Sequence, residues 1–580
     1  MGNDSTSPPD PWSRERASVQ QPVAVALALC ALLGVGSAGR SLASDGPVAL
    51  GTGTVPVSRG PSRADVVRFL EQATMGPTDA LIDHVAAVGF ERYLEEQLTA
   101  AASSYPDLPA MPGNQKVGCP AGSPTTCARD NYTMYPLQVR FFQNALKEED
   151  QLRQRVALAL HEILVVSGVS IRQPSAMGPY LNLLHGNAFG NYRTLLADLT
   201  LSPAMGDYLD MVNNPAAAPP ENIPPNENYA RELLQLFSVG VDMLNEDGSP
   251  QLDGEGRPVP AYEQETIEEL ARAFTGWTYA TLPGAGSRKS NPPNYKAPLW
   301  LYRDAQGRDT THDKGSKTLL HYPGAPHSVL PANQDGAVDL DQALDNVFFH
   351  PSVGPFVGRQ LIQHLVTSNP SPAYVARVAR VFADDGRGVR GNLASVVRAI
   401  LLDPEARGSE KSDPAYGRLR EPVLFVANLC RALGATSDGI LAAQGTAMGQ
   451  TLFNPASVFS YFSPDNEIQE RVLGPEFGIQ SSTTTIGRIN FVSTLVFNGI
   501  GRGAPTGGTS LDLSKWSPLA ADPAALVSAV SRLLLHGTMT GEAAREVTAA
   551  VAAVPATNAL ARVKTAISLV ASSSAYQVAR

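Results

Sequence analysis

Two sets of glutamate and arginine side chains have the types and spacing to do chemistry. In the first set, Glu227 and Arg231 lie four residues apart, as do Asn228 and Glu232. On an α-helix, each pair shares one face. A carboxyl group there can act as an acid or a base, and a guanidinium can bind an anion. The set predicts the polar wall of a pocket; the alternative is an ion-pair network that locks the helix to a neighbour.

The second set lies just before Thr275-Gly276-Trp277 and contains Glu268, Glu269 and Arg272. Glu268 and Arg272 again have a four-residue helical spacing. Two helices that carry such sets could face each other across a cleft. They could equally be cross-braced inside a core, and the spacing agrees with both interpretations.

Three histidines are further candidates for acid, base or ligand groups. His161, followed by Glu162, interrupts an apolar helical pattern, where a single histidine is more often a structural core residue than a ligand. His185 ends a neighbouring helix, whereas His312 lies beside Asp313 in a polar loop, the kind of segment that often carries functional residues. If these histidines and the carboxylates converged, they would suit a divalent zinc, manganese or iron ion. Their wide spacing does not show convergence, so the metal stays a hypothesis.

Other kinds of site have no counterpart in the sequence. There is no Gly-x-Ser-x-Gly motif and no glycine-rich phosphate loop, and no Cys or His pair has zinc-site spacing. The formal charge is −10, which argues against broad binding of nucleic acid, since that requires clustered Lys and Arg. We therefore expect no nucleic-acid partner.

The helices that must position these residues are predicted by apolar side chains at three- and four-residue spacings. After a first helix that begins near Arg63, they cover about 78–100, 134–168, 176–186, 191–211, 226–243, 262–277, 337–350, 352–368, 372–385, 390–402 and 418–434, with short helices over 437–516 and an Ala/Val-rich helical region over 520–580.

Irregular segments separate these helices. The chain has 50 Gly and 46 Pro, which indicates long loops. The Asp/Gly-rich stretch 245–260 predicts a small hairpin, and 278–335 predicts a long loop insertion with short strands. The expected fold class is all-α, predominantly helical, with long irregular loops and one or two small hairpins.

The N-terminus has the order of a secretory signal. Arg14 and Arg16 precede an apolar run over 23–35, and small residues follow up to Ser44. We expect a signal peptide over 1–43, a flexible linker over 44–62 and a single elaborated helical domain over 63–580. The apolar run is short for a bilayer span, which favours the signal peptide. A short N-terminal membrane anchor is the alternative. The expected location is periplasmic or secreted, with no stable membrane span after cleavage.

Cys119 and Cys127 lie close together in a loop rich in Gly, Pro and Thr. In an oxidising compartment such a pair would form a disulfide that closes a small loop. Two unpaired thiols are the alternative.

Several motifs, taken in chain order, resemble the bacterial family catalogued as domain of unknown function 1800. They are Gln151-Leu152-Arg153-Gln154-Arg155, His161-Glu162, Asn187-Ala188-Phe189-Gly190-Asn191-Tyr192-Arg193, Ser202-Pro203-Ala204-Met205, Asn226-Glu227-Asn228-Tyr229-Ala230-Arg231-Glu232-Leu233, Glu269-Leu270-Ala271-Arg272-Ala273-Phe274-Thr275-Gly276-Trp277, His312-Asp313, Lys317-Thr318, Arg420-Glu421-Pro422 and Pro455-Ala456-Ser457-Val458-Phe459.

The resemblance covers the chain from about Arg63 to the C-terminus. It implies a mostly helical exported protein of no established activity, and a partner that is itself exported and resembles sulfatases or phosphatases. Family members often show Trp-His-Asn-His-Phe where this chain has Leu160-His161-Glu162-Ile163-Leu164. The second histidine of that motif is absent here, and with it one candidate metal ligand.

Two classes of function fit these observations. The first is a hydrolase that acts on an extracytoplasmic substrate through a polar cluster of glutamates, arginines and histidines. The cluster comprises Glu227, Arg231, Glu232, Glu269, Arg272, His161 and His312. The second is a non-catalytic scaffold or binding partner of another exported protein. An enzyme should place its polar residues on an open pocket, whereas a scaffold should saturate them with one another.

Overall fold

A buried helix, α8 (Gln151–Ile163), lies at the centre of the architecture. Every residue of α8 except Arg153 is buried, and a helix that is covered on all sides belongs inside a core. It packs against helices from both halves of the chain, among them α4 (Phe90–Thr99), α10 (Pro174–Asn187) and α16 (Val353–Leu365). Polar side chains on α8 must therefore find partners inside the protein.

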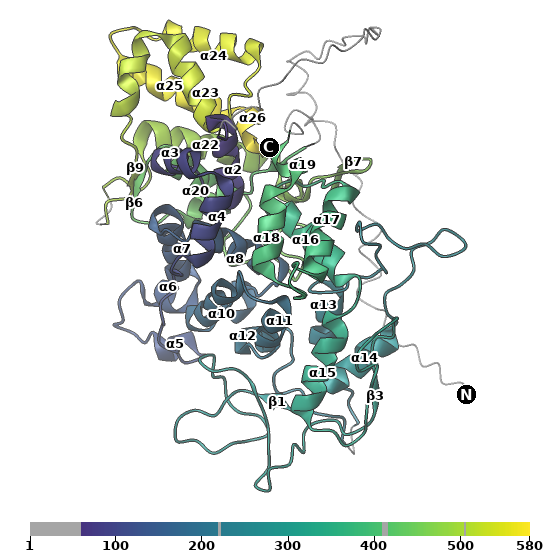
Figure 1. Ribbon diagram of the computed structural model, residues 1–580. Coiled ribbons are helices and arrows are strands. Elements are labelled where there is room, and N and C mark those ends of the chain that lie inside the picture. Colours follow the sequence, from purple (N-terminus) through teal and green to yellow (C-terminus); the bar gives the residue numbers. More distant parts are fainter. Residues whose placement is uncertain (1–59, 219–221, 409–415, 504–505) are drawn as a thin grey trace, which may run out of the picture. The chain divides into compact units, whose positions relative to one another are not determined.

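The computed structural model describes residues 60–580 except 219–221, 409–415 and 504–505 (Figure 1). In its first part, the other helices are α2 (Arg63–Ala73), α3 (Asp79–Val88), α5 (Gln115–Gly118), α6 (Cys127–Tyr132), α7 (Tyr135–Lys147), α9 (Gly168–Ile171), α11 (Tyr192–Thr200), α12 (Pro203–Tyr208), α13 (Asn228–Gln235) and α14 (Gln264–Ala273).

In the second part, the helices are α15 (Gly336–Phe348), α17 (Pro372–Ala383), α18 (Leu393–Leu402), α19 (Pro404–Arg407), α20 (Pro422–Ala432), α21 (Ala442–Ala447), α22 (Ser482–Ser493), α23 (Pro523–Leu534), α24 (Gly541–Ala553), α25 (Ala559–Ser572) and α26 (Ser574–Gln577). Short 3₁₀ or π segments are η3 (Pro475–Ile479), η4 (Thr494–Asn498) and η5 (Ser514–Ala521).

Strands are short and pair only two at a time within the described residues. The antiparallel pairs are β1 (Trp277–Thr278) with β2 (Trp300–Leu301), β3 (Lys317–Thr318) with β4 (Val329–Leu330), β5 (Arg418–Leu419) with β10 (Val578–Ala579), β6 (Thr436–Ser437) with β9 (Thr509–Ser510), and β7 (Glu467–Gln469) with β8 (Val472–Leu473). The mostly helical class is confirmed, and so is a long loop with short strands over 278–335. The expected hairpin over 245–260 is present as isolated bridges, such as Leu244 with Pro250.

Several helices predicted as continuous are broken, and the breaks have local causes. The helix expected over 78–100 divides into α3 and α4 at Gly89, whose φ of +85° is a left-handed conformation. The one expected over 134–168 divides into α7 and α8 at residues 148–150. Pro203 begins α12 and ends the helix expected over 191–211, because proline fits the first turn and not a helix interior.

The two ends of the described chain pack together. Helices α23, α24 and α25 (yellow in Figure 1) contact one another, and α23 also contacts α2 (purple). Residues from Gly60 to Arg580 form one compact unit. The predicted signal peptide and all but the last residues of the predicted linker lie outside the described residues. None of the described helices is long and apolar enough to cross a bilayer.

Gly76, between α2 and α3, permits a close backbone contact with α20. Its φ is +141°, and a Cβ atom there would lie 2.6 Å from the Cα atom of Asn428. Nothing lies within 4 Å of the corresponding position at Gly89, whose φ is also positive. A substitution at Gly89 would thus meet backbone strain alone, whereas a substitution at Gly76 would meet backbone strain and a steric clash.

We expect G76A to lower the free energy of unfolding by about 3 kcal/mol, because it combines a left-handed alanine with overpacking. The matched variant G89A carries only the conformational cost, about 1 kcal/mol. Urea denaturation of both variants measures the difference. Equal losses would contradict the close packing at Gly76.

Candidate functional site

The first predicted set lies where α13 packs against α14. Arg231 Nη2 lies 2.8 Å from Glu227 Oε2, which confirms the shared helical face. Gln264 of α14 links to both residues, since it accepts from Arg231 at 3.1 Å and donates to Glu227 at 2.8 Å. The two helices are thus cross-braced by these polar contacts.

The second set braces α14 to the loop that follows it. Arg272 pairs with Glu269 at 2.6 Å and with Asp313 at 2.9 Å. Glu268 instead accepts a hydrogen bond from Gln264. The four-residue spacing of Glu268 and Arg272 is therefore not used, because the guanidinium turns toward the Asp313 loop. Burial alone would raise the pKa of Asp313, but hydrogen bonding to Arg272 lowers it.

His312 lies in a loop, as predicted, and its side chain belongs to a buried network. Its Nε2 lies 3.0 Å from Asp339 Oδ2, and Lys317 Nζ lies 2.7 Å from the same oxygen. Gln334 donates to the other oxygen of Asp339. Burial alone would raise the pKa of Asp339, but hydrogen bonds from His312 and Lys317 lower it. This network fixes the long 278–335 loop to α15.

The remaining predicted residues lie in separate surroundings. His161 packs against the ring of Phe453, with 5.3 Å between centroids, and burial lowers its pKa to about 4. His185 packs against Tyr105. Glu232 is half-buried with Oε2 unpaired, and burial raises its pKa to about 7. No group of three or more Cys, His, Asp or Glu side chains in the described part of the chain is placed to hold a metal ion.

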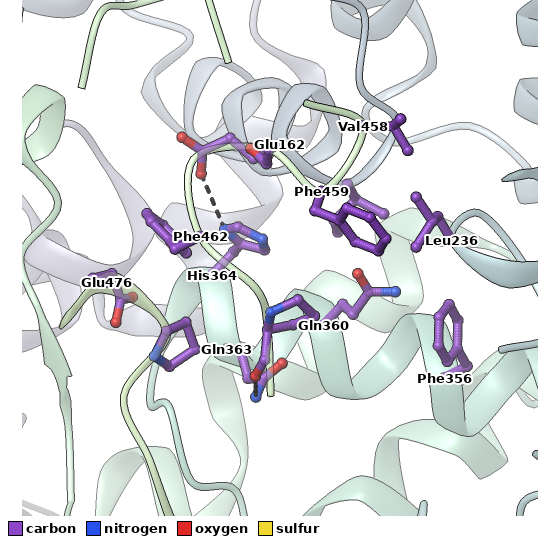
Figure 2. A pocket seen from close by; sticks show the side chains of 14 residues that line it. Glu162, Leu236, Phe356, Gln360, Gln363, His364, Val458, Phe459, Phe462 and Glu476 are labelled. Carbon is purple, nitrogen blue, oxygen red and sulfur yellow. Dashed lines mark hydrogen bonds and ion pairs between the residues drawn. The ribbon is translucent and has the colours of Figure 1, made fainter. Parts of the chain in front are cut away.

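A cavity between α8 and α16 brings together a different set of polar groups (Figure 2). Its volume of about 60 Å³ has room for a few water molecules. The lining residues come from α8, the position that follows α13, α16, η3 and the loop after α21. They are Glu162, Ile163, Leu236, Phe356, Gln360, Gln363, His364, Val458, Phe459, Ser460, Phe462, Pro464, Pro475 and Glu476. None of the seven predicted site residues lines it.

Glu162 and His364 form the polar end of this cavity. In Figure 2 their side chains point toward each other, and Nδ1 of His364 lies 3.1 Å from Oε2 of Glu162. The approach is close but not aligned as a hydrogen bond, so each atom keeps unused hydrogen-bonding capacity. His161 and Glu162 are adjacent in α8, and neighbouring helical residues point in directions about 100° apart, so only Glu162 reaches the cavity.

Glu162 is also linked, through its other carboxyl oxygen, to a buried network of charged side chains. Arg418 of β5 donates to Glu421, the N-cap of α20, at 3.0 Å and to Glu476 of η3 at 2.8 Å. Gln450 donates to Glu421 at 2.7 Å and to Glu162 at 2.9 Å. The Gln450 amide thus links the carboxyl groups of Glu162 and Glu421.

Two guanidiniums close this network at the end of α16. Both Arg155 of α8 and Arg418 donate to the backbone carbonyl of His364, in the last turn of the helix. Cations are favoured there because the carbonyl end of a helix carries a partial negative charge. Burial and the Arg418 charge lower the pKa of Arg155 to about 9.

The network separates the proton affinities of the two linked carboxyl groups. Burial and the charge of Glu421 raise the pKa of Glu162 well above its ordinary range. Burial alone would also raise the pKa of Glu421, but Arg418 and the hydrogen bond from Glu162 lower it to about 2. Glu162 therefore holds the proton of the pair, as expected when two carboxyl groups share a site.

His364 is neutral beside this protonated carboxyl. Burial and the charge of Arg418 lower its pKa to about 3. The cavity thus presents a proton donor and a proton acceptor side by side. A proton donor beside a proton acceptor is an arrangement that acid–base catalysis can use.

Four polar side-chain atoms buried on the cavity wall have no hydrogen-bond partner among the described residues. They are Glu162 Oε2, His364 Nδ1, Gln360 Nε2 and Ser460 Oγ. Buried polar atoms are nearly always paired in folded proteins. Water or another small molecule in the cavity could bond to these atoms.

A second, more apolar cleft adjoins the cavity. Its volume is about 320 Å³. Leu236, Phe356 and Phe459 line both spaces, together with Gln360, Gln363 and Pro464. The cleft also contains the charged side chains of Arg359, Asp242 and Asp465. It provides an apolar space directly beside the Glu162–His364 pair.

The residues of this site were only partly visible in the sequence. Arg155, Glu162 and Glu421 occur in the family motifs, whereas His364, Arg418 and Gln450 stood out in no pattern. A usable signal was the presence of charged residues within apolar helical runs, because such residues need internal partners.

The fold and this cavity define a mostly helical protein with a buried carboxyl–imidazole site. The chain matches the model of the family described as protein of unknown function (DUF1800) over residues 68–578, and it belongs to that family. No curated protein matches the chain, and no solved structure matches it.

The proton on Glu162 can be observed directly. We expect infrared spectra at neutral pH to contain a protonated-carboxyl band that loses intensity in E162Q. The band should also weaken as the pH rises through the native pKa. Because the native state keeps this proton better than the unfolded chain does, the free energy of unfolding should fall as the pH rises from the ordinary glutamate pKa to the native pKa, and should level off above it. E162Q should remove that contribution.

The control for this measurement is D313N, since Arg272 keeps Asp313 ionised. It should leave the protonated-carboxyl band unchanged. An unaltered band in E162Q would show that Glu162 is ionised, contrary to the site described above.

Proposed function

We propose that this chain is a hydrolase whose acid–base pair is Glu162 and His364. The observation that carries the proposal is the cavity wall, where a carboxyl of raised pKa lies 3.1 Å from an imidazole of lowered pKa. Both groups have unpaired atoms on the same small cavity. The proposal keeps the class of activity expected from the sequence and moves it to different residues.

Hydrolysis requires one proton for the leaving atom and the removal of another from the attacking hydroxyl. Glu162 donates the first, and neutral His364 accepts the second. The products are a Glu162 carboxylate and a His364 imidazolium in close contact. A proton can then return from His364 to Glu162, which restores the site without any outside group.

The alternative, a non-catalytic scaffold, draws its support from the predicted Glu/Arg sets. Those side chains are paired with one another across α13, α14 and the Asp313 loop, as a structural brace requires. The Glu162 cavity differs, because four polar atoms on its wall have no hydrogen-bond partner among the described residues. We therefore favour catalysis at the cavity and a bracing role for Glu227, Arg231, Glu269 and Arg272.

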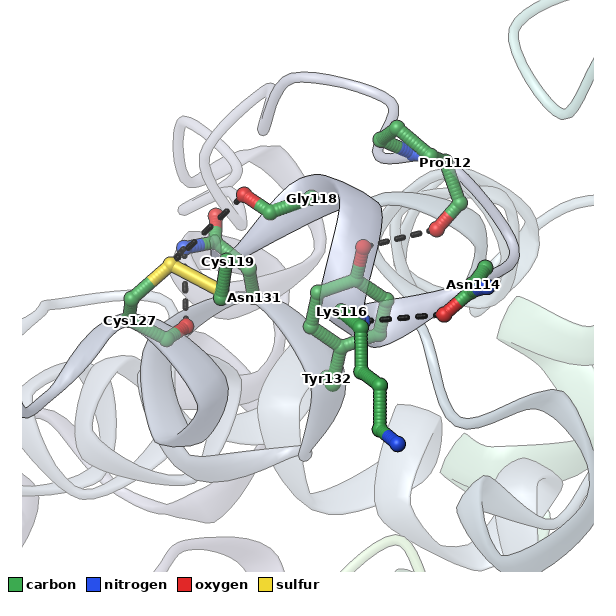
Figure 3. The surroundings of a disulfide bond; sticks show 8 residues. All are labelled: Pro112, Asn114, Lys116, Gly118, Cys119, Cys127, Asn131 and Tyr132. Atoms are coloured by element: carbon green, nitrogen blue, oxygen red, sulfur yellow. Dashed lines mark hydrogen bonds between the residues drawn. A yellow bond between two sulfur atoms is a disulfide. The ribbon is translucent and has the colours of Figure 1, made fainter. Parts of the chain in front are cut away.

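We also propose that the substrate lies outside the cytoplasm. Cys119 and Cys127 form a disulfide with 5.9 Å between Cα atoms (Figure 3), and stable disulfides are typical of oxidising compartments. The signal-like sequence over 1–43 points the same way. Periplasmic or secreted location, and an exported partner that resembles sulfatases or phosphatases, remain expectations from the sequence.

The test is hydrolysis by the purified full chain of p-nitrophenyl carboxylic esters of graded acyl length, p-nitrophenyl phosphate and 4-methylumbelliferyl glycosides. We expect turnover of at least one class. E162Q and H364N should each lower kcat by about 10²- to 10⁴-fold, the usual contribution of a positioned acid or base. The control E227Q, in the α13–α14 brace, should retain wild-type turnover.

Two results would count against the proposal. One is wild-type turnover by E162Q and H364N. The other is a folded chain that hydrolyses none of these substrates, which would favour the scaffold.

A further inference from the structure

Ser460 lies on the wall of the Glu162–His364 cavity, and its side chain has no structural partner. It is 8% exposed, and its Oγ has no hydrogen bond among the described residues. A buried serine hydroxyl normally bonds to a nearby carbonyl or side chain. The hydroxyl of Ser460 is instead left free on the cavity that contains the proposed acid–base pair.

The backbone of Ser460 is held in an unfavourable conformation. Its φ is +66°, in the left-handed region that favours glycine. The turn is fixed by two bonds to Ser457, whose carbonyl accepts from the Ser460 N–H at 3.1 Å and whose hydroxyl accepts from the Phe459 N–H at 3.2 Å. Strain of this kind is often retained where a side chain must be presented to a site.

We propose that Ser460 is the nucleophile of this site and that the substrate is a carboxylic ester or amide. The inference rests on the proposed function and adds a covalent step to it. Each of the unpaired atoms on the wall then has a role: Ser460 attacks, His364 accepts its proton, Glu162 donates to the leaving group, and Gln360 donates a hydrogen bond to the oxyanion.

The chemistry balances over two steps. In the first, Ser460 Oγ bonds to the acyl carbon and passes its proton to His364. The bond from that carbon to the leaving oxygen or nitrogen breaks, and the leaving atom takes the proton of Glu162. The proton on His364 then passes to Glu162, which restores the pair. In the second step, water bonds to the acyl carbon and passes a proton to His364, while the bond to Ser460 Oγ breaks and that oxygen takes the proton of Glu162. A second transfer from His364 to Glu162 restores the site. The products are the free acid and an alcohol or amine.

The adjoining cleft suits the acyl part of such a substrate. Leu236, Phe356 and Phe459 are shared by the cleft and the cavity, so an acyl chain in the cleft would place its carbonyl carbon beside Ser460. Small-molecule sites typically combine apolar walls with a few polar groups.

The experiment treats the purified full chain with a fluorophosphonate, which phosphonylates activated serine hydroxyls. Intact-mass and peptide mass spectrometry then locate the adduct. We expect one adduct, on Ser460, and its absence in S460A. Ester turnover in S460A should fall by about 10³-fold or more, as when a triad member is removed. H364N should slow the labelling.

Two further variants serve as controls. S460G removes the hydroxyl and relieves the positive φ, so it tests the chemistry without the risk of misfolding. It should behave as S460A does. S482A, at an exposed position at the start of α22 and outside both the cavity and the cleft, should label and turn over as the wild type does.

The outcomes separate this inference from the proposed function. Unlabelled Ser460, or full ester turnover in S460A and S460G, overturns the nucleophile; if E162Q is still inactive, the acid–base pair stands with water attacking directly. If the wild type hydrolyses none of the substrates, both the nucleophile and the acid–base pair are overturned.

Discussion

The interior of this protein depends on the buried charge of Arg418. Its guanidinium donates to Glu421, Glu476 and the carbonyl of His364, and so ties β5 to α20, η3 and the end of α16. A buried charge without partners is very costly. These elements must therefore meet at this point, and β5 itself is paired with the C-terminal strand β10.

The same charge sets the chemistry of the cavity. Arg418 keeps Glu421 ionised, and the ionised Glu421 leaves the proton on Glu162. It also helps to keep His364 neutral. A structural ion pair thus produces a proton donor beside a proton acceptor, both facing a small cavity. Structure and proposed function depend on one network.

The sequence predicted the pattern within a helix better than the contacts between helices that are distant in the chain. The helical spacing of Glu227 and Arg231 was predicted and is confirmed, because it depends on only one helix. Breaks such as Gly89 were missed, since periodicity does not show a left-handed turn. The cavity was missed for a stronger reason. Periodicity identifies the buried faces of α8 and α16 but not that Glu162 and His364 face each other.

The family motifs contained some residues of the buried network but not all of them. Arg155, Glu162 and Glu421 were all in the motifs that carried the resemblance, and all three belong to the Arg418 network. The remaining members, His364, Gln450 and Glu476, lie in segments where nothing in the sequence distinguished them. Their role appears only when the packing of α8 against α16 and α20 is known.

We propose that Glu162 is held for chemistry, whereas Arg418 stabilises the fold. Urea unfolding of E162Q and R418M at neutral pH tests it most directly. Glutamine mimics the protonated carboxyl. The free energy of unfolding of E162Q should therefore lie within about 1 kcal/mol of the wild-type value or above it. R418M should lose about 3–5 kcal/mol, because it leaves buried carboxylates unpaired. If E162Q were as unstable as R418M, Glu162 would be a structural part of the network and the account would be wrong.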